Sequence, residues 1–154
     1  MAAEQPIATS RAATGADLDA ILDLDHSLTG RTRRRFYQAR LAATEHEPMD
    51  FVSLVIEAEG RIFGFAFAHV LSGEFGGTER VAVVDAIGVR PEARGHALGK
   101  QLMDAVERQL LACGVREIQT QAAWTDIDMV RFLASAGFAL APKFVLERDT
   151  TATL

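Results

Sequence analysis

The chain has 154 residues, a length typical of one compact domain with a single substantial core. Hydrophobic residues make up 49% and charged residues 24%, a composition that excludes intrinsic disorder. The net charge of −5 disfavours nucleic acid and anionic lipid as partners, because the protein as a whole repels phosphate. We expect one domain over residues 1–154, with its core at about 7–148 and a tail at 149–154.

Signals for export, membrane insertion and metal binding are missing from the sequence. The longest nearly apolar stretch, residues 62–71, is about half as long as a membrane-spanning helix. The N-terminus lacks the basic start and the apolar run of a secretory signal. The one cysteine, Cys113, cannot form an internal disulfide, and the four histidines have no zinc-like spacing. These features predict a cytoplasmic protein without a metal or a membrane span.

Strands and helices are predicted in the order β, α, α, β, β, β, α, β, α, β. A strand at residues 7–12 precedes a helix that opens at Asp17 and a short basic helix at 31–43. Strands at 51–56 and 61–70 form a hairpin, and a glycine-rich loop at 72–78 leads to the clearest strand, 80–90. A helix at 99–113, a strand at 115–122, a helix at 126–135 and a terminal β segment at 138–148 follow. This order predicts a mixed sheet covered by helices, an α/β fold of the α+β type.

Residues 85–100 carry the clearest chemical signal. A buried strand ends there, a turn with Gly and Arg follows, and a long helix begins. Unpaired N–H groups and the positive end of the helix dipole make such a helix start an anion site. A Walker A loop is excluded, because Gly95 and Gly99 enclose three residues and Gln101 follows Lys100. A dinucleotide fingerprint is absent as well.

Residues 94–99, Arg-Gly-His-Ala-Leu-Gly, resemble the acetyl-CoA-binding motif of the GNAT superfamily of N-acetyltransferases. The preceding VRPEARG phrase, RAATGADLDAIL at 11–22 and FLASAGF at 132–138 look like that family too. The resemblance spans about residues 7–148. It implies a single-domain, mixed, mostly antiparallel sheet flanked by about four helices, and acetyl-CoA as acyl donor.

Two positions depart from the family pattern. Ala97 stands where the family usually has glycine, which puts a Cβ into the phosphate turn. Leu133 stands where many members carry a tyrosine that can protonate the leaving thiolate, so the usual general acid is missing.

The resemblance also implies roles for individual residues. Asp85 is the candidate general base, directly or through a water, and we place it on the same strand face as Ile87 and Val89. A salt-bridged or capping carboxylate is an equally weighted alternative. The oxyanion would be held by a backbone N–H near residues 87–89. The candidate cofactor-binding residues are Ile87, Gly88, Val89, Arg94, Gly95, His96, Ala97, Leu98, Gly99, Lys100, Asp126 and Leu133.

Five arginines cluster between residues 31 and 40, in a region that borders the substrate groove in the family. They could hold an acceptor carboxylate or an acidic protein surface, reach the cofactor's phosphates, or form a solvated helix face. Tyr37 lies among them, as a substitute acid or as packing. Trp124 either lines the acceptor pocket or packs in the core or at the rim. The candidate substrate-binding residues are Arg31, Arg34, Arg35, Tyr37 and Trp124.

The sequence therefore predicts an N-acetyltransferase that moves an acetyl group from acetyl-CoA to a primary amine of a small molecule or of a protein, in one ternary complex. The alternative is a GNAT-like module that binds acyl-CoA without catalysis, and Leu133 is the feature in its favour. The arginines favour a partly anionic amine as the acceptor. Homodimer formation is a further possibility that the sequence leaves open.

Overall fold

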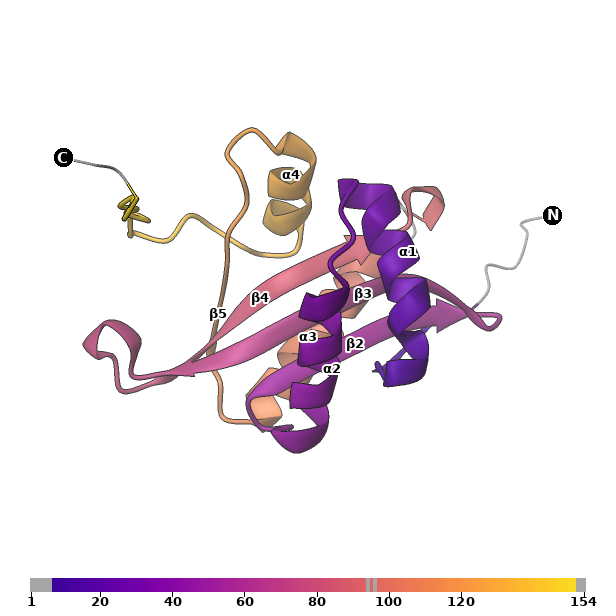
Figure 1. Ribbon diagram of the computed structural model, residues 1–154, viewed down its shortest axis with the longest axis horizontal. Coiled ribbons are helices and arrows are strands. Elements are labelled where there is room, and N and C mark those ends of the chain that lie inside the picture. The colour runs from indigo at the N-terminus through magenta and orange to yellow at the C-terminus, as the bar shows by residue number, and fades with distance from the viewer. Residues whose placement is uncertain (1–6, 94, 96, 152–154) are drawn as a thin grey trace.

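The structure is a computed structural model that describes residues 7–93, 95 and 97–151 (Figure 1). The strands are β1 (Thr9–Ala12), β2 (Phe51–Ala58), β3 (Arg61–Ser72), β4 (Arg80–Val89) and β5 (Glu117–Thr120). The α-helices are α1 (Leu18–Thr29), α2 (Arg34–His46), α3 (Leu98–Ala112) and α4 (Ile127–Ser135). Short 3-10 helices lie at η1 (Gly15–Asp17), η2 (Glu74–Gly76) and η3 (Pro91–Ala93).

The five strands form one sheet in the order β1-β2-β3-β4-β5. Strands β1 to β4 are antiparallel to their neighbours, and β5 runs parallel to β4 after the crossover through α3. The mixed, mostly antiparallel sheet and the four helices that the sequence predicts are thus confirmed.

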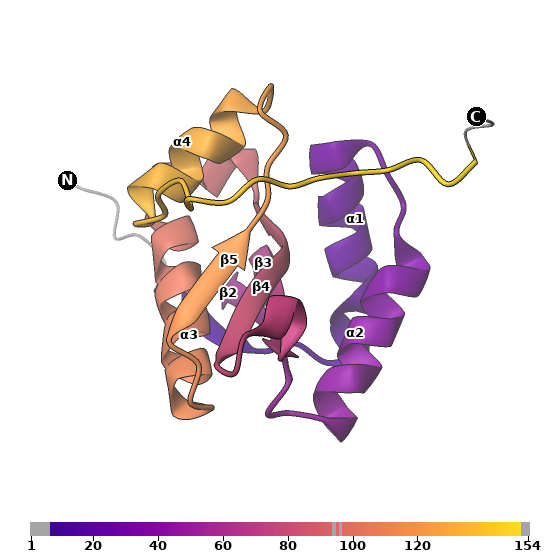
Figure 2. The same ribbon diagram turned by 90° about the vertical axis from the view of Figure 1, so that its left-hand side faces the viewer.

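Two apolar layers hold the helices against the sheet. Helix α3 covers one face, where Leu102, Val106 and Leu110 pack on side chains of β2, β3 and β4. Helices α1 and α2 cover the other face, around Phe65, Phe67 and Tyr37. Figure 2 shows the sheet between these two layers, with α4 near the top of α3. Burial on both faces explains why β2 and β3 are nearly continuous apolar runs.

The terminal β segment predicted at 138–148 is wrong. Residues 139–148 are exposed and belong to no strand of the structure. An alternating apolar pattern favours extended backbone, but a strand also needs a neighbour that takes its backbone hydrogen bonds. The predicted strand at 115–122 is likewise shorter, since only Glu117–Thr120 pairs with β4.

A β-bulge interrupts β4 where the sequence places its candidate base. Phe67 pairs with Ala86 and Ala68 pairs with Val84, which leaves Asp85 without a partner on β3. An extra residue on one strand puts two consecutive side chains on one face. Side chains before and after the bulge therefore do not follow the simple alternation assumed from the sequence.

Candidate active site

The site begins where β4 and β5 separate. The two strands pair only from Val81 to Val84, and the Thr120 hydroxyl donates a hydrogen bond to the Val84 carbonyl at 3.0 Å. Beyond this point β4 pairs with β3 alone. The other edge of β4, from Asp85 to Val89, therefore presents backbone N–H and C=O groups that have no strand partner in the described part of the chain.

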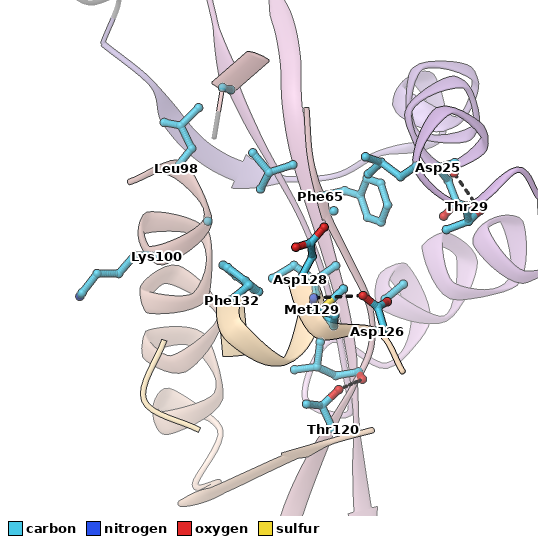
Figure 3. Close-up of a pocket in the computed structure, with 18 of the residues that line it drawn as sticks. Asp25, Thr29, Phe65, Leu98, Lys100, Thr120, Asp126, Asp128, Met129 and Phe132 are labelled. Carbon is cyan, nitrogen blue, oxygen red and sulfur yellow. Dashed lines mark hydrogen bonds between the residues drawn. The ribbon is translucent and has the colours of Figure 1, made fainter. Parts of the chain in front are cut away.

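A cleft of about 750 Å³ follows this free edge. It reaches from Asp25 and Thr29 of α1, along β4, to the start of α3 and the first turns of α4. Figure 3 shows the same arrangement, with Asp25 and Thr29 on one side and α4 with Asp126 and Asp128 across the middle. The volume lies within the range of small-molecule and cofactor sites.

The turn before α3 forms one end of the cleft. Gly95 has φ +86, and Ala97 has φ 58 and ψ 16, so both are in the left-handed region. The first intrahelical bond runs from Gln101 N–H to the Ala97 carbonyl at 2.9 Å. The N–H groups of the preceding helix residues thus have no intrahelical acceptor, as an anion site requires. Leu98, Gly99 and Lys100 line the cleft here, as do Gly95 and Ala97, whereas Arg94 and His96 lie outside the described residues.

Gly99 is held by packing against α4. A Cβ at this position would lie 2.5 Å from Cε2 of Phe132, closer than any real contact. Both residues line the cleft. The glycine therefore lets α4 lie close to the start of α3, a role that the sequence pattern does not reveal.

Asp85 lies among cationic and polar side chains. Its Oδ2 is 2.7 Å from Nδ1 of His69 and 3.1 Å from a guanidinium nitrogen of Arg40. His69 stacks on Phe51, and the Arg40 guanidinium lies 5.4 Å from the centroid of the same ring. Oδ1 of Asp85 has no hydrogen-bond partner among the residues that the structure describes, and Asp85 lines the cleft.

The β-bulge places Asp85 on a different face of the sheet from the one predicted. Arg40 belongs to α2, so Asp85 points to the α1/α2 side of the sheet, as does its neighbour Ala86. Ile87 packs on the opposite, α3 side. Asp85 and Ile87 therefore lie on different faces, although both line the cleft. The Asp85 carboxylate forms a salt bridge, which agrees with the alternative of a salt-bridged carboxylate. It also borders the cleft, as a general base must.

A second ion pair closes the α1 end of the cleft. Asp25 is 1% exposed and accepts from Arg33 Nε at 2.9 Å and from Arg33 Nη2 at 2.5 Å. Nη2 also lies 3.0 Å from the Tyr37 hydroxyl. The hydrogen bonds that Arg33 donates to Asp25 raise the pKa of Arg33, and burial raises the pKa of Tyr37 well above its ordinary value of 10. Arg33 is charged, and Tyr37 stays a neutral phenol.

The predicted substrate-binding residues lie away from the cleft. Arg31, Arg34 and Arg35 are exposed, Trp124 is 91% exposed, and none of them lines it. Tyr37 is fully buried in the aromatic cluster with Phe36, Phe65 and Phe67, which fits its packing alternative. The structure does bring Ile87, Gly88, Val89 and Asp126 to the cleft, and Asp126 also caps α4 by accepting from Met129 N–H at 3.1 Å. Leu133 is buried in α4 and does not line the cleft.

Sequence reasoning missed Asp25 and His69 as site residues, and it placed Arg33 and Arg40 in the arginine cluster without naming them among the substrate-binding candidates. A signal for the two arginines exists. Arg33, Tyr37 and Arg40 are spaced by four and three residues, so they share one face of a helix. Asp25 gives no such signal, because its burial depends on the packing of α1 against α2.

Residues 7–93, 95 and 97–151 contain neither a metal-binding cluster nor a membrane-spanning helix. No group of three or more His, Cys, Asp or Glu side chains there is arranged to hold a metal ion. No helix of that described part is long and apolar enough to cross a membrane.

Comparison with known proteins assigns this architecture to a family. The family model described as "Acetyltransferase (GNAT) family" matches residues 18–138. Mycothiol acetyltransferase of Arthrobacter sp. (strain FB24) is 34% identical over 103 residues, which are 67% of this chain and 30% of that protein. Mycothiol acetyltransferase of Pseudarthrobacter chlorophenolicus is 31% identical over 120 residues, which are 74% of this chain and 36% of that protein. The chain thus spans about a third of the length of these relatives.

Solved structures with the same fold are more distant in sequence. AAC(6')-Iy in complex with the bisubstrate analogue CoA-S-monomethyl-acetylneamine superposes with a TM-score of 0.78 at 20% identity, covering 93% of this chain and 98% of that one. The aminoglycoside 6'-N-acetyltransferase AAC(6')-Ih of Acinetobacter baumannii gives 0.79 at 17% identity, covering 95% and 100%.

Proposed function

Because the chain belongs to the GNAT family of acetyltransferases, we propose that its cleft transfers an acetyl group from acetyl-CoA to a primary amine of a small molecule, in one ternary complex. The family resemblance expected from the sequence is confirmed by the family match, whereas the activity of this chain and acetyl-CoA as its donor are part of the proposal. The acceptor, the residues involved and the order of events are its other parts. The observation that carries it is the free edge of β4, with Asp85 at its start and the anion-binding turn at its end.

The cofactor fits the long axis of the cleft. A pantetheine arm carries amide groups, and the unpaired backbone of β4 from Asp85 to Val89 can hydrogen-bond to them as a strand would. The pyrophosphate then meets the N–H groups at the start of α3, where the helix dipole favours negative charge. Lys100 adds a positive charge, and its Nζ lies 3.0 Å from Oδ2 of Asp104.

Asp85 is suited to remove the proton that the ammonium group of the acceptor must lose. His69 and Arg40 contact Oδ2, whereas Oδ1 has no hydrogen-bond partner among the described residues, and Asp85 lines the cleft. The proton passes to Oδ1, directly or through a water, the amine nitrogen bonds to the acetyl carbon, and the carbon–sulfur bond breaks. A backbone N–H of the free β4 edge near residues 87–89 stabilises the oxyanion between these events.

Tyr37 does not take the place of the tyrosine missing at Leu133, because it is buried and bonded to Arg33. The leaving group does not require one. A thiol with a pKa of about 8.5 leaves as a thiolate, which takes a proton from solvent.

The acceptor enters from the α1 side. Arg33 and Thr29 line that end, and Nη1 of Arg33 has no hydrogen-bond partner among the described residues, so it can donate to a hydroxyl or a carboxylate of the acceptor. Because Asp25 balances the charge of Arg33, the tilt toward an anionic amine that the arginine cluster suggested is weaker than expected. Small-molecule acceptors are favoured by a cleft of about 750 Å³ that also has to hold the cofactor.

Replacing Asp85 by Asn tests the proposed base. We expect turnover to fall by about 10²- to 10⁴-fold, while acetyl-CoA affinity stays within about threefold of wild type. Glu107→Gln on the exposed face of α3 is the matched control and keeps full turnover. If Asp85→Asn keeps the wild-type rate from about pH 6 to about pH 9, the carboxylate only positions α2 against the sheet.

A further inference from the structure

Two apolar side chains, Leu28 of α1 and Phe65 of β3, form a wall over Gly88 of β4. A Cβ added to Gly88 would lie 2.7 Å from Cδ1 of Leu28 and 3.0 Å from Cζ of Phe65, so the space above this glycine is already filled. Phe65 is 1% exposed, and Leu28 is half-buried against the same apolar layer. All three residues line the cleft, and Figure 3 shows Phe65 on the side of Asp25 and Thr29.

The hydrogen-bond pattern of β4 determines which of its backbone groups face the cleft beside this wall. Arg90 N–H donates to the Phe63 carbonyl at 2.7 Å, and the register with β3 is regular from Val89 back to Ala86. In an antiparallel ladder, hydrogen-bonded pairs alternate with pairs whose backbone groups point away from each other. The N–H groups of Ile87 and Val89 therefore point away from β3, toward the free edge of β4.

The position of the acyl group follows from the proposed function, on which this inference rests. The pyrophosphate binds at the start of α3, so the pantetheine arm reaches the free edge from the α3 end of the cleft. The thioester oxygen accepts from Ile87 or Val89 N–H, and the sulfur lies on the α3 side of the carbonyl carbon. The acyl chain is bonded to the opposite side of that carbon and therefore extends toward α1 and the wall.

We propose that Leu28, backed by Phe65, limits the transferred acyl group to acetyl. An acetyl group presents a single methyl, whereas propionyl and butyryl chains extend further toward α1 and meet Leu28. Phe65 is held by ring contacts with Tyr37 and Phe67, at centroid distances of 5.6 and 6.1 Å, so it does not move aside for a longer chain. Leu28 lies in the last turn of α1, where a smaller side chain leaves the core in place.

Graded substitutions of Leu28 test this limit with one amine and three donors, acetyl-, propionyl- and butyryl-CoA. We expect the wild type to prefer acetyl-CoA over propionyl-CoA by about 10- to 200-fold in kcat/KM, as a pocket does that excludes one methylene. Leu28→Val and then Leu28→Ala shorten the side chain, so the preference should fall stepwise, to less than about fivefold in Leu28→Ala. The Val variant keeps most of the side chain and carries the test if Leu28→Ala does not fold.

Leu18→Ala is the matched control. Leu18 lies on the same helix, is half-buried against the same apolar layer as Leu28 and does not line the cleft. The control should therefore keep the wild-type preference among the three donors. A wild type that uses all three donors equally, or an unchanged preference in both Leu28 variants, overturns the proposal. It is also overturned if the Leu28 variants change only the KM of the amine, because Leu28 then contacts the acceptor.

Binding measurements separate this inference from the proposed function. Titration calorimetry with the three acyl-CoA donors, in the absence of an amine, measures the acyl preference whether or not turnover occurs. We expect Leu28→Ala to bind butyryl-CoA about tenfold more tightly, relative to acetyl-CoA, than the wild type does. If the donors bind without turnover, catalysis fails and an unchanged binding preference in Leu28→Ala overturns the acyl limit as well. If no donor binds to the wild type, the proposed function fails and this inference fails with it.

Discussion

Ala97 shows at the scale of one residue how the phosphate turn is built. Its φ of 58 and ψ of 16 lie in the left-handed region, where a Cβ crowds the backbone. The sequence marks this position, since the resembling family usually has glycine there. The structure supplies the reason, which is backbone conformation rather than space for the phosphate.

Replacing Ala97 by glycine is expected to raise the free energy of unfolding by up to about 1 kcal/mol. Relief of the left-handed strain outweighs the greater freedom that glycine gives the unfolded chain. Urea denaturation measures the change. Ala112→Gly, at the exposed end of α3, is the matched control and should lower the free energy by about 0.5–1 kcal/mol. If Ala97→Gly lowers the free energy of unfolding as Ala112→Gly does, the backbone of the turn is unstrained.

The candidate base shows what a single sequence can predict at this scale and what it cannot. The spacing around residues 85–100 identifies Asp85 as a residue that borders the cleft. Its face on β4 was predicted wrongly, because one bulged residue reverses the alternation of the strand. Its contacts with Arg40 and His69 come from α2 and β3, and long-range packing of this kind has no local signature.

At the scale of elements, the close approach of α3 and α4 shapes the cofactor end of the cleft. Gly99→Ala is expected to lower the free energy of unfolding by about 1–3 kcal/mol, because its Cβ meets the Phe132 ring. It should also weaken acetyl-CoA binding, measured by calorimetry. Phe132→Ala in the Gly99→Ala background removes the clash, so the two effects are not additive. Strictly additive effects would mean that the glycine acts through the turn alone.

A carboxylate at the junction of β1 and α1 makes stability depend on pH. Asp17 accepts from both terminal nitrogens of Arg11, at 2.8 and 2.9 Å, and from Thr14 N–H at 2.8 Å. The hydrogen bonds from Arg11 lower the pKa of Asp17 below its ordinary value of 3.8. The carboxylate therefore stabilises the fold fully above that value, and the contribution is lost as the pH falls through the lower, folded-state pKa.

Asp17→Asn is expected to lower the free energy of unfolding at neutral pH by about 1–3 kcal/mol and to flatten its fall below about pH 4. Thermal unfolding followed from pH 2 to pH 7 measures both effects. Glu117→Gln, which changes an exposed carboxylate on β5, is the matched control and should leave the stability close to that of the wild type. If the free energy of unfolding of Asp17→Asn falls below about pH 4 as steeply as that of the wild type, other groups cause the pH dependence.

At the scale of the whole molecule, hydrophobic periodicity predicted the order of elements from β1 to α4, since each period reflects a buried face. It failed at residues 138–148, where the same alternation has no strand partner among the described residues. The arginine cluster illustrates the same limit. Five arginines lie close together in the sequence. Only the packing of α1 against α2 determines that Arg33 lines the cleft while Arg31, Arg34 and Arg35 do not.

Thiol release from acetyl-CoA in the presence of a panel of primary amines tests the account most directly, with the melting temperature recorded at the same cofactor concentrations. The account predicts that acetyl-CoA raises the melting temperature by mass action and that at least one small-molecule amine releases thiol and is recovered as its N-acetyl derivative. A raised melting temperature without thiol release from any amine would contradict catalysis and leave an acyl-CoA-binding module. An unchanged melting temperature at millimolar acetyl-CoA would contradict the cofactor site itself.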